Sequence, residues 1–291
     1  MTNMMKRILV GAVGIPVAVG TIYLGGWVFA VGVVIITSLA LREFYTLAES
    51  KAASPNVPLG IAWSILLQIT IAKAAESPDL MGLGMFALGV LLFIAGTIAT
   101  LTAELFRARE NALLNTALTV FGVAYITTCM SSLLMLRAAK DDMLVGAWGD
   151  AGATLILIMF VAVWTCDSAA YFVGVNLGKH KLFPRVSPKK SWEGSIAGLF
   201  ASVIVFIGLC TWLMPSFGLV NAAACGLIAG IFGQIGDLVE SLLKRDAIVK
   251  DSGGILPGHG GIFDRFDSML FVAPLVMIYI ALVDIIPAFL P

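Results

Sequence analysis

The sequence predicts an all-α, polytopic integral membrane protein with about nine transmembrane helices and a cytoplasmic N-terminus. Of its 291 residues, 59% are hydrophobic and only 12% are charged, whereas an ordinary soluble domain is about 25% charged. The mean hydropathy is +0.99 and the net charge is zero. This composition excludes a soluble globular enzyme, a disordered chain and a nucleic-acid-binding protein, which needs an excess of cations.

The apolar runs give the expected helices in chain order. A helix needs about 20 apolar residues to cross a bilayer core. The first run, 8–41, is too long for one span, so we expect two helices with a turn at Gly25-Gly26. Its length also argues against a cleavable signal peptide. Seven further runs predict one helix each: 57–75, 80–103, 113–136, 154–177, 194–214, 222–243 and 269–290.

The distribution of cations predicts the topology. The segments outside the expected helices alternate along the chain, and one alternate set holds 15 Lys and Arg residues while the other holds 3. This asymmetry is the positive-inside pattern. We therefore expect a multi-pass protein of the inner (cytoplasmic) cell membrane, with its C-terminus outside and its active site on the cytoplasmic side.

Polar residues within or beside the expected helices concentrate after residue 160. We expect one integral membrane unit in two parts. Residues 1–150 would form a scaffold that offers a dimer or lipid-facing region, and residues 151–291 would carry the cytoplasmic catalytic loops. The four cysteines lie in apolar runs without CxxC spacing, which predicts buried apolar side chains rather than disulfides or a zinc site.

Two carboxylates lie inside expected helices, where a charge must face the bundle interior and find partners. Asp167, near the middle of its span, belongs either to an interhelical contact or to a site. Asp237 shares a helix face with Gly233 and Ser241, because these residues are spaced by four. Lys244 follows seven residues later, so Asp237 lies about 10 Å below the cytoplasmic end of its helix.

The loop after this helix is rich in glycine and in charge of both signs. Residues 241–267 include five glycines, four cations and four carboxylates. The Gly-His-Gly-Gly segment at 258–261 predicts exposed backbone N–H groups that can wrap phosphate oxygens. Asp264 and Asp267 share a face if the next helix begins there, and with Asp237 they would make a hard-oxygen Mg²⁺ site. The alternative is a solvated loop with surface ion pairs.

A second cation-rich loop precedes the expected helix 194–214. Ser191 can cap that helix, with Glu193 in its first turn. A helix N-terminus beside Lys189 and Lys190 is suited to bind an anion. The alternative is a positive-inside loop that anchors anionic lipid headgroups.

The charge balance of the two loops narrows the substrate. Residues 179–267 contain nine Lys and Arg and seven Asp and Glu. Two divalent cations would raise this region to about +6, which matches a nucleoside triphosphate of about −4 together with a lipid phosphate of about −1.5 to −2. The balance therefore favours metal-assisted phosphoryl or nucleotidyl transfer to a lipid.

Residues 241–267 resemble the signature of the phosphatidate cytidylyltransferase (CDP-diacylglycerol synthase) family. Its pattern is S-x-φ-K-R-x4-K-D-x-G-x2-φ-P-x-H-G-G-φ-x-D-R-φ-D, with φ apolar, and every fixed position is met. Segments 236–241, 167–174, 187–194 and 42–45 (Arg-Glu-Phe-Tyr) also resemble that family. The resemblance implies the reaction CTP + phosphatidate → CDP-diacylglycerol + pyrophosphate in phospholipid biosynthesis. It also implies Mg²⁺ as cofactor, leaves a second cation open, and implies a homodimer.

The resemblance implies roles for individual residues. Asp237 and Asp264 would be the main metal ligands, with Asp267 close by. Lys250 would hold a phosphate, and His259 would contact phosphate or order the glycines around it. Substrate contacts are expected for a larger set: Lys189, Lys190, Ser191, Ser241, Lys244, Arg245, Gly260, Gly261, Arg265 and Asp167.

Two other functions stay open at this point. A cytidylyltransferase acting on an isoprenoid-ether phosphatidate would keep the fold and change only the lipid. A cation transporter would use Asp167 and Asp237 as intramembrane ligands, but it leaves the glycine-rich, cation-rich loop unexplained. Consumption of CTP or dCTP with phosphatidate would distinguish the phosphatidate cytidylyltransferase from the transporter.

Overall fold

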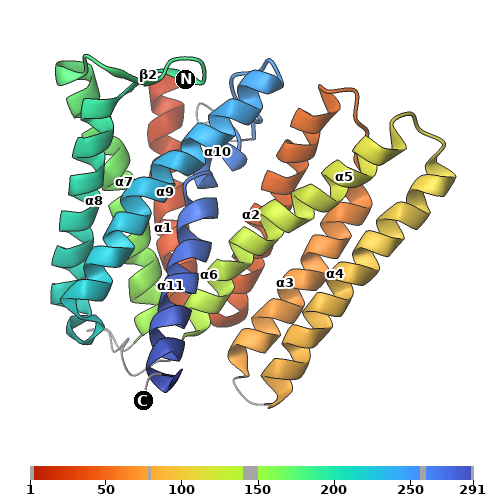
Figure 1. Cartoon of the computed structure of the whole chain (residues 1–291), viewed down its shortest axis with the longest axis horizontal. Helices are drawn as coiled ribbons and strands as arrows, with labels where there is room; N and C mark the ends of the chain where they lie inside the picture. Colours follow the sequence, from red (N-terminus) through yellow and green to blue (C-terminus); the bar gives the residue numbers. More distant parts are fainter. Residues whose placement is uncertain (1–2, 78–79, 140–149, 256–259, 290–291) are drawn as a thin grey trace. The chain divides into compact units, whose positions relative to one another are not determined.

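A computed structural model of the chain is almost entirely helical (Figure 1). It describes residues 3–77, 80–139, 150–255 and 260–289. Within these ranges, eight helices are long and apolar enough to cross a membrane, and a shorter apolar stretch, Val10–Leu24, lies in the first helix. A polytopic helical membrane protein is therefore confirmed, with eight such helices plus this stretch against the nine expected. The side of the membrane on which each terminus lies stays a prediction.

The helices follow the apolar runs closely, because apolar side chains favour the membrane while the backbone satisfies its own hydrogen bonds only in a helix. A π-helical turn, Val123–Thr127, interrupts one span without ending it. The elements are α1 (Asn3–Leu24), α2 (Gly26–Glu49), α3 (Val57–Glu76), α4 (Leu80–Arg107), α5 (Ala112–Gly122), α6 (Thr128–Ala138), α7 (Ala151–Leu177), β1 (Lys181–Phe183), β2 (Ser187–Ser191), α8 (Trp192–Leu213), α9 (Leu219–Asp246), α10 (Phe263–Phe266) and α11 (Met269–Phe289).

The first apolar run divides at the predicted glycine pair. Gly25 separates α1 from α2 and has a φ angle of +62°, a conformation that is costly for residues with a side chain. A Cβ atom at this position would also overlap the guanidinium group of Arg137. The Arg137 Nε in turn donates a 2.7 Å hydrogen bond to the Ile22 carbonyl. Glycine at 25 therefore provides both the turn and the space for the arginine.

Three helices begin at side-chain caps that the local sequence supplies. Asn56 accepts a hydrogen bond from the Leu59 amide at the start of α3, and Asp150 accepts one from the Ala153 amide at the start of α7. Ser191 accepts one from the Gly194 amide and so caps α8, as its position predicted. Each cap satisfies a backbone N–H group that has no partner within its helix.

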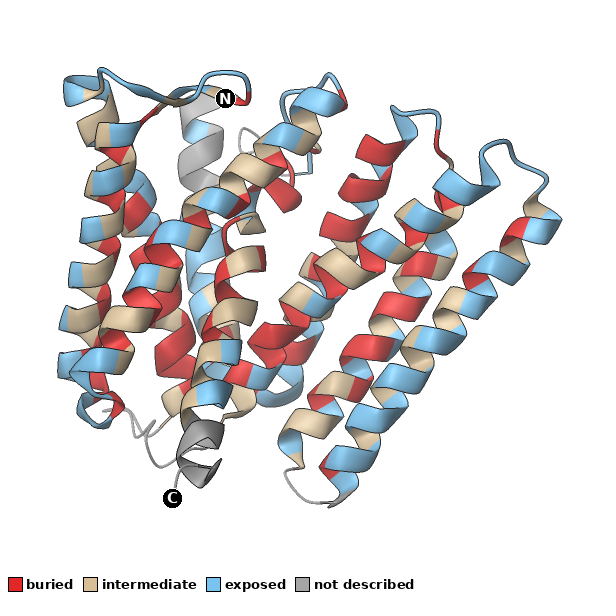
Figure 2. Ribbon diagram, in the orientation of Figure 1, coloured by how far each residue is buried: buried red, intermediate tan, exposed pale blue. Residues whose placement is uncertain are grey.

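The chain forms two compact units, and each is built from two separate stretches of the sequence. Unit 1 contains residues 1–138 and 243–266, and unit 2 contains residues 139–242 and 267–291. The described residues 250–255 and 260–262, which we call the glycine loop, therefore belong with α2 and the other N-terminal helices. Within unit 1, α2 and α6 carry many buried residues, whereas α4 is mostly exposed (Figure 2).

Unit 2 is organised around close packing of α7 against α8. A Cβ atom at Gly194 would lie 2.5 Å from the Ala170 carbonyl oxygen and 3.1 Å from the Cα atom of Gly174. Glycine therefore allows the two backbones to approach, as is common between membrane helices. The antiparallel hairpin β1–β2 joins these helices and pairs Lys181 with Ser191, a small exception to the predicted all-α fold.

The four cysteines are free thiols, as their positions predicted. Cys166, Cys210 and Cys225 are buried, and Cys129 is partly buried. All four lie in helices of the membrane-spanning type. They behave as small apolar residues and take no part in the site described below.

Candidate active site

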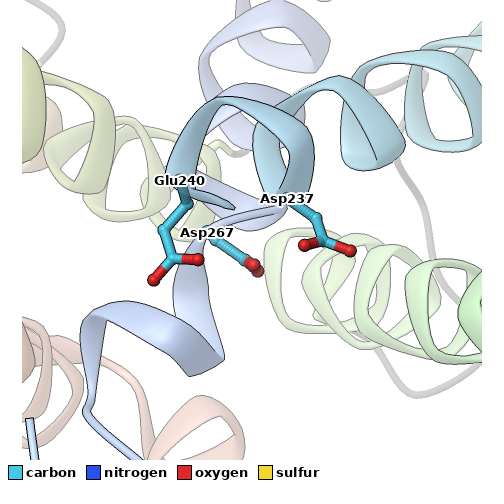
Figure 3. Close-up of side chains that lie close together, drawn as sticks. All are labelled: Asp237, Glu240 and Asp267. Atoms are coloured by element: carbon cyan, nitrogen blue, oxygen red, sulfur yellow. The ribbon is translucent and has the colours of Figure 1, made fainter. Parts of the chain in front are cut away.

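Three carboxylates gather on one side of α9 in unit 2. Asp237 and Glu240 lie three residues apart on α9, and Asp267 follows α10 directly (Figure 3). Each residue offers a carboxylate oxygen, and these oxygens all lie within 4.8 Å of one another. Gly236 makes room for this arrangement, because a Cβ atom there would lie 2.5 Å from the Asp267 carbonyl oxygen. The structure thus brings together Asp237 and Asp267, as predicted, and adds Glu240.

The donor set of this acidic cluster (Asp237, Glu240 and Asp267) fits a hard divalent cation. Glu240 is fully buried, and the two aspartates are partly buried. Three carboxylates so close together repel one another strongly unless positive charge lies among them. Oxygen donors of this type are those that Mg²⁺ and Ca²⁺ prefer. These three residues could therefore hold Mg²⁺.

A lysine from the hairpin supplies positive charge to the acidic cluster. The Lys190 Nζ lies 2.6 Å from Asp237 Oδ2, and both side chains are partly exposed. Lys190 lies in β2, directly before the Ser191 cap of α8. The hairpin itself is fastened by the His180 ring, whose Nδ1 lies 2.6 Å from a Glu193 carboxylate oxygen. Hairpin and helix cap therefore place one cation of the predicted anion site beside Asp237.

A second lysine–carboxylate pair lies in unit 1. The Lys244 Nζ donates a 2.6 Å hydrogen bond to Asp264 Oδ1, and both side chains are largely buried. The other oxygen, Oδ2, accepts hydrogen bonds from the backbone amides of Ser252, at 3.1 Å, and Gly261, at 2.7 Å. The composition of the loop predicted an exposed Gly261 amide. In the structure this amide instead donates to the Asp264 carboxylate. The role of Asp264 as a metal ligand stays a prediction.

The structure describes all but one of the remaining predicted residues. Ser241 donates a 3.4 Å hydrogen bond to Asp237 Oδ1, which joins it to the acidic cluster. Gly260 adopts a φ of +81°, which requires glycine. His259 lies outside the described residues. Four of the predicted cations are exposed: Lys189, Arg245, Lys250 and Arg265.

Asp167 differs from its expected placement. The cost of a charge inside a span predicted that it would face the bundle interior, but its residue is exposed on α7. Its substrate contact stays a prediction.

Two glutamates were missed by reasoning from the sequence. Glu240 could have been found, because a residue three positions after Asp237 lies on nearly the same helix face. Glu43 on α2 is buried, and its carboxylate accepts hydrogen bonds from Ser252, Ile262 and Phe263. The one local signal for Glu43 was a carboxylate inside an apolar helix, in the Arg-Glu-Phe-Tyr segment.

Comparisons with known proteins agree over nearly the whole chain. Residues 5–283 match the Cytidylyltransferase family. A phosphatidate cytidylyltransferase of Bacillus subtilis is 33% identical, with 97% of this chain and 99% of that protein covered. Proteins of the same name from Staphylococcus aureus and Synechocystis are 34% and 31% identical, covering 94% and 95% of this chain and 98% and 96% of theirs. The chain therefore belongs to the cytidylyltransferase family.

Proposed function

We propose that this protein is a phosphatidate cytidylyltransferase, which converts CTP and phosphatidate into CDP-diacylglycerol and pyrophosphate. The observation that carries the proposal is the acidic cluster with Lys190 beside it, in a chain whose relatives of similar length bear that name. A metal-binding group of carboxylates next to cations suits a triphosphate. The apolar helices suit a second substrate that reaches the site from the bilayer.

The proposed reaction exchanges one phosphoanhydride bond for another. A phosphate oxygen of phosphatidate attacks the α-phosphorus of CTP, and a new P–O bond forms. The bond from the α-phosphorus to the bridging oxygen breaks, and pyrophosphate leaves with that electron pair. When bound, Mg²⁺ would neutralise phosphate charge and help to align the two substrates.

The residues of this chain have distinct tasks in that reaction. Asp237, Glu240 and Asp267 would hold the cation, with Asp264 as a further proposed ligand. Lys190 and Lys244 now pair with carboxylates, and their ammonium groups can turn to phosphate oxygens once a cation takes over those carboxylates. The exposed Arg245, Lys250 and Arg265 would attract the triphosphate from solution.

The test uses the purified full-length protein with labelled CTP, phosphatidate and Mg²⁺. We expect CDP-diacylglycerol and pyrophosphate in equal amounts, no product with ATP, and no turnover after chelation of the metal. An arm with an isoprenoid-ether phosphatidate tests the alternative lipid. Release of inorganic phosphate, or cation flux without nucleotide, would contradict the proposal.

The assembly and the cellular location are part of the same proposal. We infer a homodimer in the inner (cytoplasmic) membrane, with both charged loops on the cytoplasmic side. The family resemblance supports the dimer, and the cation distribution supports the orientation. Crosslinking in native membranes, at protein levels too low for random encounter, tests the dimer directly.

A further inference from the structure

Glu43 is a buried carboxylate in the apolar helix α2. It is 4% exposed, and α2 is one of the helices suited to cross a membrane. A carboxylate in such a helix needs strong compensation, since neither lipid nor apolar side chains solvate it. The compensation therefore has to come from polar groups that the fold brings to Glu43.

The compensation comes from residues about 210–220 positions away in the sequence. Glu43 Oε1 accepts a 3.1 Å hydrogen bond from the Ile262 amide. Glu43 Oε2 accepts a 2.8 Å hydrogen bond from the Phe263 amide and a 3.2 Å one from the Ser252 hydroxyl. One carboxylate therefore joins the two described ends of the glycine loop and the first residue of α10.

Two glycines of the family signature leave space for this carboxylate. A Cβ atom at Gly253 would overlap Glu43 Oε1, and one at Gly261 would overlap Oε2 and the Ser252 hydroxyl. Neither position requires glycine for its φ angle. Glycine at these two signature positions is thus explained by the approach of Glu43, a residue outside the signature.

The same loop residues also hold Asp264. Ser252 gives its hydroxyl to Glu43 and its amide to Asp264. The Gly261 amide donates to Asp264, and the next two amides donate to Glu43. Because the two carboxylates share one short stretch of backbone, a shift of Glu43 displaces the frame that orients Asp264 and its partner Lys244.

We propose that Glu43 is a positioning residue, which fixes the glycine loop so that Asp264, Lys244 and Arg265 meet the substrates in register. It acts through the loop and touches no substrate. The kinetic test of this inference rests on the proposed function. The hydrogen-exchange test measures the loop itself and needs no activity. It gives the N-terminal helices a part in the reaction beyond that of a scaffold.

The first test replaces Glu43 by glutamine, which has nearly the same shape. The amide offers one acceptor oxygen and turns an NH₂ group toward an N–H or O–H donor, so the loop loses part of its anchor. Because misplacement of a site by about 1 Å can cost about 10²-fold, we expect turnover at saturating substrates to fall at least about 30-fold. The KM for phosphatidate should stay within about twofold, since Glu43 does not bind it. Glu49→Gln is the matched control, because Glu49 lies on the same helix and is exposed.

The second readout is hydrogen exchange of the backbone in detergent, without substrates. In Glu43→Gln we expect faster exchange in 252–255 and 260–263, with α3 and α7 unchanged. If the wild-type protein made no CDP-diacylglycerol, the proposed function would fail while this measurement still tested the role of Glu43.

Two outcomes overturn the proposal. One is wild-type turnover and wild-type exchange in Glu43→Gln. The other is a purely structural role, in which exchange rises throughout α2, α3 and α5 while turnover per folded molecule is unchanged. If Glu43→Gln does not fold, Ser252→Ala removes one donor and keeps both amide contacts. It should quicken exchange in the loop and lower turnover about 3- to 10-fold, and no change in either also overturns the proposal.

Discussion

Lys190 and Asp237 are oppositely charged residues whose contact must change when a divalent cation binds. A 2.6 Å ion pair joins Lys190 to Asp237, one of the three clustered carboxylates. A metal ion and the ammonium group compete for the same oxygens. We therefore expect Lys190 to weaken binding of the cation alone and to strengthen binding of the cation together with a triphosphate.

This competition gives a prediction with opposite signs for two ligands. In Lys190→Met, Mn²⁺ should bind about 1.4- to 5-fold more tightly without nucleotide, which corresponds to the roughly 0.2–1 kcal/mol of a partly exposed ion pair. The kcat/KM for CTP should fall at least about tenfold, because a charge-assisted contact to phosphate is lost. Electron paramagnetic resonance measures the free Mn²⁺. The control is Lys181→Met, because Lys181 is an exposed residue of β1. Weaker Mn²⁺ binding in Lys190→Met would refute the competition.

At the scale of the elements, α9 approaches the start of α11 through a glycine. A methyl group on Gly236 would lie 2.5 Å from the Asp267 carbonyl oxygen and 3.1 Å from the Cα atom of Ser268. Both neighbours are backbone atoms, so they cannot move aside by rotating a side chain. The Ser268 hydroxyl also donates a 3.0 Å hydrogen bond to the Gly233 carbonyl, which holds the two segments together.

Gly236→Ala should therefore lower both stability and activity. We expect a loss of about 1–3 kcal/mol in unfolding free energy from overpacking, and displacement of Asp267 should reduce CDP-diacylglycerol formation. Gly208→Ala on α8 is the control, because no heavy atom lies within 4 Å of the added methyl group. Thermal unfolding in detergent and a turnover assay check the pair. Equal melting temperatures for the two variants would contradict the close approach.

The sequence predicted these elements well where the information is local. Hydropathy located the long helices within a few residues, and Gly25 and Ser191 marked a turn and a cap that the structure contains. The hairpin was missed because its strands are short and polar, without alternation. Glu43 was missed because its contacts cross about 210–220 residues of sequence, and no periodicity encodes such a pairing.

At the scale of the whole molecule, the uneven distribution of cations between the loops predicts the orientation of the protein in the membrane. Cations are retained on the cytoplasmic side during insertion, and the two loops proposed to bind the substrates hold nine of the 18 Lys and Arg residues. CTP is a cytoplasmic nucleotide in the proposed reaction. The proposed function therefore requires the orientation that the cations predict.

Cysteine labelling in intact cells tests this orientation. In a chain whose four cysteines are replaced, Lys181→Cys and Lys250→Cys should react with a membrane-impermeant maleimide only after the membrane is opened. Leu219→Cys, at the start of α9, should react in intact cells. All three positions are exposed, so accessibility within the fold does not differ between them. Labelling of Lys181→Cys or Lys250→Cys in intact cells would place a substrate loop on the wrong side.

The measurement that tests the central claim most directly is turnover of Asp237→Asn with CTP, phosphatidate and saturating Mg²⁺. The claim is that the acidic cluster holds the cation on which cytidylyl transfer depends. The variant keeps the shape of the side chain and removes its charge, so we expect a folded protein that loses at least about 10³-fold in rate, or about 4 kcal/mol of transition-state stabilisation. Asp246→Asn is the control, because Asp246 ends the same helix and is exposed, in an ion pair with Lys51. If Asp237→Asn kept more than about a tenth of the wild-type rate, less than about 1.4 kcal/mol, the acidic cluster would not be the catalytic metal site.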